Sequence, residues 1–164
     1  MSNDTSPRRE RSPRPDESEH ERLDRNLMEL LGELRVALPG VQVLFAFLLA
    51  VPFQQRFADV TSFQRDVYFA TLCCALVASA CLIAPTAFHR ITFRLQQKEA
   101  LLRYANRLAI VGLAALSLAM TGVMLLISDY LFDTTTAIVT TALAFLLLAL
   151  LWGALPLQRR LRAG

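Results

Sequence analysis

Four stretches of the chain contain no Asp, Glu, Lys, Arg or His, and each is 18 to 22 residues long. About 20 apolar residues in a helix, at roughly 1.5 Å per residue, cross the ~30 Å hydrocarbon layer of a membrane. The pattern predicts an all-α integral membrane protein, a four-helix bundle with spans at about 36–55, 66–88, 107–127 and 136–157. The charge-free stretches are Val36–Phe53, Val67–Phe88, Leu108–Ile127 and Ala137–Leu157.

Leucines recur at helical spacing just before the first span. They form one stripe of a helix, with charged residues on the other positions. We expect this amphipathic helix to lie along the inner membrane surface; the alternative is a helix docked onto a partner or a second protomer. Pro39-Gly40 predicts a bend between it and the span. The stripe consists of Leu23, Leu27, Leu30, Leu31 and Leu34.

The remaining polar segments complete the predicted organisation. Residues 1–20 hold no large aliphatic side chain beyond Met1, which predicts a disordered cytoplasmic tail. The expected parts are this tail, an amphipathic juxtamembrane helix at 21–38, a four-span domain at 39–157 and a basic tail at 158–164. Spans two and three are expected to continue as helices beyond the membrane and to turn near Gln96-Gln97. Asp133-Thr134-Thr135-Thr136 predicts the start of span four, because such residues cap helices.

Composition narrows the class of protein. The chain is 54% hydrophobic and 19% charged, with a mean hydropathy of +0.40. A soluble domain usually carries about 45–50% apolar and ~25% charged residues. Together with the spans, these values exclude a water-soluble enzyme, a nucleic-acid-binding module and a disulfide-stapled secreted domain.

The distribution of positive charge predicts the orientation. Of the 17 Lys and Arg residues, 15 lie in the two terminal segments and the loop at 89–107, and two lie in the loop at 54–66. Basic loops are retained in the cytoplasm. We therefore expect a protein of the bacterial inner membrane with both termini on the cytoplasmic side and its basic segments in contact with anionic lipid headgroups. The first 20 residues contain no apolar signal, so we expect the first span to act as an uncleaved insertion signal.

No protonatable side chain lies inside any of the four apolar stretches. A cation or proton antiporter needs a titratable group inside the membrane, where such groups usually mark function. Cys73, Cys74 and Cys81 share span two and are read as packing residues, with neither a disulfide nor a metal site. We therefore expect no enzyme activity and no cofactor. The uncharged polar candidates are the amide of Gln42 and six hydroxyls, which are expected to bond their own helix. The hydroxyls belong to Thr71, Ser79, Ser117, Thr121, Thr140 and Thr141.

One polar grouping stands out near the cytoplasmic boundary. A buried amide needs several hydrogen-bond partners, and Gln42 lies one turn inside the predicted boundary. The hypothesis is a polar cluster that links the first span to the foot of the second. The alternative is that its members are separate interfacial anchors, since charged residues near helix ends commonly extend to the interface. The cluster would contain Glu33, Arg35, Gln42, His89 and Arg90.

Two segments carry a resemblance to a known family. Asn26–Leu49, which includes the run Leu38-Pro39-Gly40-Val41-Gln42, and Ala84–Arg90 resemble small four-span bacterial membrane proteins of unknown function, most familiar from actinobacteria. The likeness covers Leu23 to Leu157. Some of these relatives bear automatic sodium:proton antiporter labels, but the resemblance implies no functional residues.

Two hypotheses about function follow. The first is a non-catalytic structural or accessory protein that works by self-association or by joining another membrane complex. The second is a small oligomeric cation or proton transporter, which the absence of an intramembrane carboxylate disfavours. Sodium-dependent proton movement in proteoliposomes would distinguish them. No nucleic-acid partner is expected, because no aromatic and basic surface motif is present.

Overall fold

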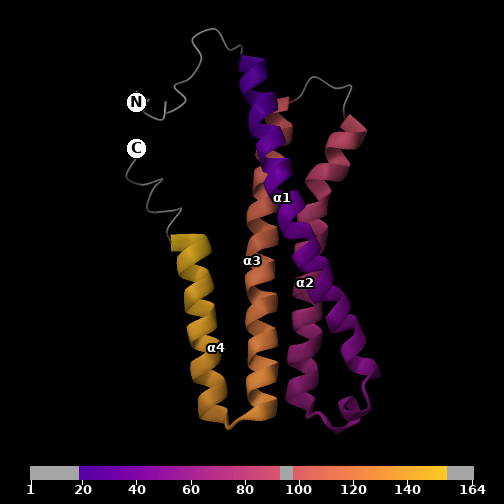
Figure 1. Ribbon diagram of the computed structural model, residues 1–164, viewed down its shortest axis with the longest axis vertical. Coiled ribbons are helices and arrows are strands. Elements are labelled where there is room, and N and C mark those ends of the chain that lie inside the picture. The colour runs from indigo at the N-terminus through magenta and orange to yellow at the C-terminus, as the bar shows by residue number, and fades with distance from the viewer. Residues whose placement is uncertain (1–18, 93–97, 155–164) are drawn as a thin grey trace, which may run out of the picture.

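Four long helices make up the computed structural model, which describes residues 19–92 and 98–154 (Figure 1). Within these residues there is no β-strand, which confirms the predicted all-α helical bundle. Two short 3₁₀ segments join α1 to α2, and a π-helical turn extends α4. The elements are α1 Glu19–Ala50, η1 Val51–Phe53, η2 Gln55–Asp59, α2 Ser62–Thr92, α3 Lys98–Leu131, α4 Thr134–Ala149 and η3 Leu150–Ala154.

Each long helix is apolar enough over 20 to 30 residues to cross a membrane. Four such segments make a multi-pass membrane protein, as the charge-free stretches predicted. Spans two and three continue beyond the bilayer length, to Thr92 and from Lys98. The predicted turn at Gln96-Gln97 and the tails at 1–18 and 155–164 lie outside the described residues. The candidate spans are Met28–Phe53, Ser62–Ala87, Leu102–Leu131 and Thr134–Gly153.

The predicted amphipathic segment and the predicted first span belong to one helix. Helix α1 is continuous from Glu19 to Ala50 with Pro39 inside it. Leu34 is only 6% exposed and shares a core cluster with residues of α2 and α3, and Leu30 and Leu38 pack against that cluster. The second half of the leucine stripe is therefore buried against the chain's own helices.

Helices α2 and α3 approach each other closely along faces of small residues. Ala75 and Ala78 of α2 and Ala119 of α3 are fully buried. A Cβ atom built on Gly112 would lie 2.8 Å from Leu82 Cγ, and one built on Gly122 would collide with the hydroxyl of Thr71. Without a hydrophobic force between helices in lipid, such close backbone approach is what holds spans together.

Helix α4 packs against α3 and makes no substantial contact with α1 or α2 in the described part of the chain (Figure 1). Ala137 is its one buried residue, and its large apolar side chains are mostly exposed. The hydroxyl of Thr140 lies 2.9 Å from that of Ser128 on α3 and forms a hydrogen bond with it. The described bundle is therefore a three-helix unit with a fourth helix attached to α3, and most of the surface of α4 is exposed.

The two helices that start at the α1–α2 loop end carry side-chain caps. Thr61 and Gln64 form a capping box, because the Gln64 backbone N–H donates to Thr61 Oγ1 (3.2 Å) and the Thr61 backbone N–H donates to Gln64 Oε1 (3.1 Å). Asp133 caps α4 and accepts from the backbone N–H groups of Thr135 (3.0 Å) and Thr136 (3.3 Å). The predicted N-cap cluster is confirmed.

We expect Asp133→Ala to lower the thermal stability of the protein at neutral pH. The Thr136 hydroxyl and then its backbone N–H, both donating to the carboxylate, lower the pKa of Asp133 below its ordinary 3.8. A lowered native pKa stabilises the fold above the ordinary value, and this contribution disappears as the pH falls through the lowered pKa. Thermal unfolding in mild detergent between pH 3 and pH 7 measures the difference between variant and wild type.

The matched control for this measurement is Asp59→Ala, which removes a carboxylate from η2 at the same end of the bundle. Asp59 is exposed and caps no helix, so its replacement should change the melting temperature little at any pH. A gap between Asp133→Ala and wild type that stays the same from pH 7 to pH 3 would contradict a charged cap.

Candidate functional site

The structure describes the side chains of three of the five residues in the predicted polar cluster. Glu33, Arg35 and Gln42 are all exposed on α1, and no hydrogen bond joins them. Each residue turns about 100° around a helix, so Glu33 and Arg35 point to nearly opposite sides. His89 and Arg90 belong to the α2 backbone, but their side chains lie outside the described residues. The cluster as a whole stays a prediction.

Gln42 is a polar side chain exposed inside a span. It lies within Met28–Phe53, six residues or about 9 Å from the start of the charge-free stretch at Val36. Its amide, with two donor hydrogens and an acceptor oxygen, makes no hydrogen bond within residues 19–92 and 98–154. In a hydrocarbon environment, a polar group without a partner is costly. Gln42 is therefore a polar group in a span that no described residue of the chain satisfies.

The exposed residues around Gln42 follow one line along α1 and into η1. Their spacing alternates between four and three residues, the repeat that keeps side chains on one side of a helix facing a neighbouring helix. The line begins with a charge, has the amide near its middle and ends with aromatic and aliphatic side chains. We call it the Gln42 stripe; its members, all exposed, are Arg35, Pro39, Gln42, Ala46, Leu49 and Phe53.

The hydroxyls predicted to bond their own helices do so in four cases. Thr71, Ser79, Thr121 and Thr140 each donate to the carbonyl four residues earlier, at 2.7 to 2.9 Å. These bonds satisfy the side chains inside the protein, as expected. Thr141 differs, since its Oγ1 atom is buried and has no hydrogen-bond partner.

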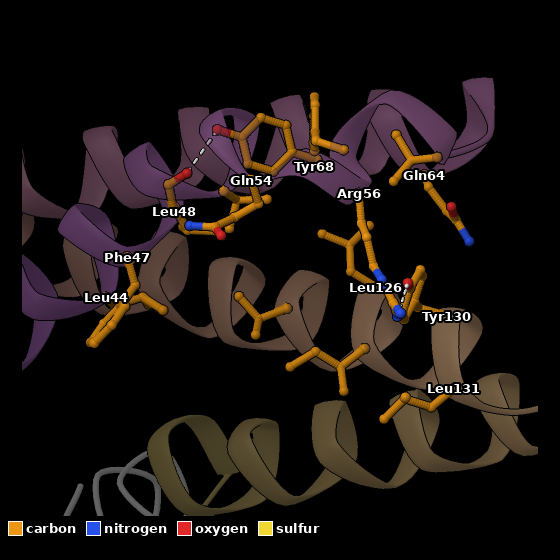
Figure 2. Close-up of a pocket in the computed structure, with 15 residues that line it drawn as sticks. Leu44, Phe47, Leu48, Gln54, Arg56, Gln64, Tyr68, Leu126, Tyr130 and Leu131 are labelled. Carbon is orange, nitrogen blue, oxygen red and sulfur yellow. Dashed lines mark hydrogen bonds between the residues drawn. The ribbon is translucent and has the colours of Figure 1, made fainter.

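A groove of about 550 Å³ runs along the bundle between α1 and α3 at the end nearest the α1–α2 loop (Figure 2). Its walls are almost entirely apolar, and its polar side chains gather at one end. The lining consists of Leu44, Phe47, Leu48, Val51, Gln54, Arg56, Phe57, Val60, Gln64, Tyr68, Val123, Leu126, Ile127, Tyr130 and Leu131.

A proline in the chain explains the position of Tyr68 in the groove wall. The Leu48 carbonyl would normally accept a hydrogen bond from the backbone of residue 52, but Pro52 has no N–H. The Tyr68 hydroxyl donates to this carbonyl at 2.8 Å (Figure 2), and the Tyr68 ring meets Phe57 edge-on at 5.2 Å. This bond satisfies the carbonyl and ties the end of α1 to α2.

Polar side chains from three elements meet at the loop end of the groove. The Arg56 guanidinium of η2 donates to the Tyr130 hydroxyl of α3 at 3.5 Å (Figure 2). The Gln64 side-chain amide of α2 donates to Asp129 Oδ2 at 2.9 Å. Among the described residues, no carboxylate oxygen lies within 4 Å of the Arg56 guanidinium. The mouth of the groove therefore carries one cation without a paired anion.

The sequence analysis did not identify this groove. Two signals were nevertheless present, namely Pro52 four residues after Leu48, which leaves a carbonyl without its donor, and the Thr61-to-Gln64 capping pattern. Neither signal identifies the side chain that donates to the Leu48 carbonyl. That pairing depends on the crossing of α1 over α2, which no local pattern specifies.

The described residues form neither a disulfide nor a cluster of metal-binding side chains. Cys73, Cys74 and Cys81 are free thiols along α2. No group of three or more His, Cys, Asp or Glu side chains lies close enough to hold a metal ion within residues 19–92 and 98–154. The polar chemistry of the described chain is thus found in the Gln42 stripe and the mouth of the groove.

Comparison with known proteins gives one match. No curated protein and no solved structure is similar to the chain at a significant level. A family model described as a family of unknown function (DUF6328) matches residues 16–156, which include all four spans. The chain therefore belongs to the DUF6328 family, whose function is unknown.

Proposed function

We propose that this chain is a non-catalytic protein of the bacterial inner membrane that works by helix association. Helix α1 would join a second copy of the chain or a subunit of another membrane complex through the Gln42 stripe. The observation that carries this proposal is the Gln42 amide, exposed within a span and without a hydrogen-bond partner in the described chain. Glutamine side chains in membranes form hydrogen bonds between helices.

A second copy would supply the simplest partner. In a two-fold symmetric dimer the same surface faces itself, so Gln42 would meet the partner's Gln42. Each amide can donate to and accept from the other, which removes the cost of an unpaired polar group. Ala46 lies one turn further along the same stripe and would permit close approach of the two backbones.

The orientation follows from charge. In the described chain, the α1–α2 loop and the α3–α4 loop lie at the same end of the bundle (Figure 1). Residues 51–61 and 132–133, which form these loops, contain one arginine, whereas 15 of the 17 basic residues belong to the other end or to the tails. This asymmetry supports termini on the cytoplasmic side.

We expect Gln42→Leu to weaken self-association in liposomes by about 3- to 30-fold. The range corresponds to the ~0.6–2 kcal/mol of a hydrogen bond between helices in a membrane. Energy transfer between two fluorescently labelled populations, measured as a function of protein-to-lipid ratio, gives the dissociation constant. Gln42→Asn, which keeps a side-chain amide, should retain part of the association.

Gln55→Leu is the matched control, because it makes the same chemical change at an exposed position of η2, outside the four long helices. Equal association of wild type and Gln42→Leu would contradict self-association through this stripe. If wild type is monomeric, a membrane protein retained at fixed stoichiometry by wild type and lost with Gln42→Leu supports the accessory form. Sodium-dependent proton movement in proteoliposomes would overturn the non-catalytic proposal in favour of a transporter.

A further inference from the structure

The groove between α1 and α3 combines an apolar furrow with a single cation at one end. We infer that it binds one acyl chain of an anionic phospholipid, whose phosphate lies on Arg56. This lipid site is separate from the Gln42 stripe and does not depend on the proposed association.

The length of the groove matches one leaflet of a membrane. One wall runs from Leu44 of α1 through η1 to Gln54, which is ten residues or about 15 Å at the rise of a helix. One leaflet is half of the ~30 Å hydrocarbon thickness. An acyl chain that follows this wall therefore has its headgroup beside Gln54 and Arg56.

The groove has room for an extended hydrocarbon chain, because about 550 Å³ is available along about 15 Å of its wall. Its lining is almost entirely apolar, as contact with an acyl chain requires. Helix α4 does not fill the groove, because α4 packs on α3 alone.

Two of the polar side chains in the groove wall are paired within the protein. The Tyr68 hydroxyl is bonded to the Leu48 carbonyl, and the Gln64 side-chain amide is bonded to Asp129 and to the backbone of Thr61. Gln54 and Arg56 remain at the loop end, and the rest of the furrow is apolar, a surface that stays dry and binds hydrocarbon. In a bilayer the available hydrocarbon is lipid.

The mouth of the groove recognises a negative headgroup. The Arg56 guanidinium has five donor hydrogens and uses one of its nitrogens to reach the Tyr130 hydroxyl at 3.5 Å. No described carboxylate is within 4 Å of it. A planar guanidinium binds phosphate oxygens in pairs. The Tyr130 hydroxyl beside it can donate to the same phosphate.

The test is binding of phosphatidylglycerol to the full-length protein, delipidated in mild detergent and followed by native mass spectrometry. Wild type should retain one phosphatidylglycerol per chain, about tenfold more tightly than phosphatidylcholine of the same acyl composition. Arg56→Gln should reduce the affinity for phosphatidylglycerol about tenfold, to that for phosphatidylcholine, since a charged hydrogen bond contributes about this factor. Val51→Phe, which adds bulk to the furrow, should weaken binding of both lipids.

Two matched variants separate the groove from general surface effects. Arg65→Gln removes the other arginine at this end of the bundle, which does not line the groove, and should leave binding unchanged. Ile138→Phe adds a ring on an exposed face of α4, outside the groove, and should also have no effect. Unchanged thermal unfolding of Arg56→Gln and Val51→Phe excludes loss of the fold as the cause.

Four results would overturn the inference. They are equal retention of the two lipids by wild type, equal losses with Arg56→Gln and Arg65→Gln, unchanged binding with Val51→Phe, and cross-linking of groove residues to a second copy in place of lipid. The third result would place the lipid elsewhere, and the fourth would make the groove a protein interface. Loss of dimerisation with Gln42→Leu alone leaves this inference intact, because Gln42 does not line the groove.

Discussion

Replacing Gly122 with alanine is expected to destabilise the bundle by about 1–3 kcal/mol, the usual cost of overpacking a close contact. A Cβ atom at this position would collide with the Thr71 hydroxyl on α2 and lie 3.1 Å from Thr71 Cβ. The hydroxyl is held in place by its bond to the Val67 carbonyl at 2.7 Å. Unfolding by sodium dodecyl sulfate in mixed micelles, followed by circular dichroism, measures the loss.

The partner residue gives a direct check. Thr71→Ala removes the obstructing hydroxyl and methyl groups, so Gly122→Ala should cost less in that background than in wild type. Thr71→Ser keeps the hydroxyl and should rescue little. Gly153→Ala is the control, because nothing lies within 4 Å of the position of its added Cβ, and it should change stability by no more than about 0.5 kcal/mol. Strict additivity of Gly122→Ala and Thr71→Ala would contradict the steric account.

Tyr68→Phe is expected to cost about 1–3 kcal/mol, because it leaves the buried Leu48 carbonyl without a donor. The aromatic ring remains, so its edge-on contact with Phe57 is kept and the hydroxyl is tested alone. The loss should appear in the same detergent unfolding assay. Because Tyr68 is only 7% exposed, water in the assay cannot readily replace the missing donor.

A second substitution supplies the missing donor from the backbone. Pro52→Ala restores an N–H at the position from which the Leu48 carbonyl would accept in an uninterrupted helix. In the Pro52→Ala background, Tyr68→Phe should therefore cost less than in wild type. Equal costs in the two backgrounds would show that the Tyr68 hydroxyl does not substitute for the N–H that Pro52 lacks.

Local patterns in the chain were enough to predict most of the secondary structure. The charge-free stretches predicted four spans, and four apolar helices are present. The predicted cap at Asp133 is confirmed, as are the bonds of four hydroxyls to their own helices. These features depend on residues within about four positions of one another. The sequence therefore contains the information without reference to the rest of the fold.

The leucine stripe predicted an amphipathic helix but not the surface that its leucines contact. The same spacing suits a membrane surface, a second protomer or the chain's own core. Pro39 lies inside α1, which continues as a helix on both sides of it. Packing of Leu34 and Val41 against Leu82 of α2 decided the outcome, and both are almost fully buried.

The Gln42 stripe and the groove differ in how far the sequence predicts them. Gln42 could be singled out from sequence as a rare amide in a span, but its exposure depends on which face of α1 meets α2 and α3. The lipid groove could not be predicted at all, since Arg56, Tyr68 and Tyr130 come from three separate elements.

The amino-acid order alone determined a helical protein with four membrane spans, because hydrocarbon demands apolar side chains and an internally bonded backbone along each crossing. Only the tertiary structure decided that α1 buries leucines against α2 and α3 and that α4, in the described chain, packs mainly against α3. It also decided that an apolar groove with one cation lies between α1 and α3. The physical reason is that lipid surrounds every apolar face equally well. Helix pairing then depends on close steric fit between small residues such as Gly122 and Thr71, which hydropathy does not record.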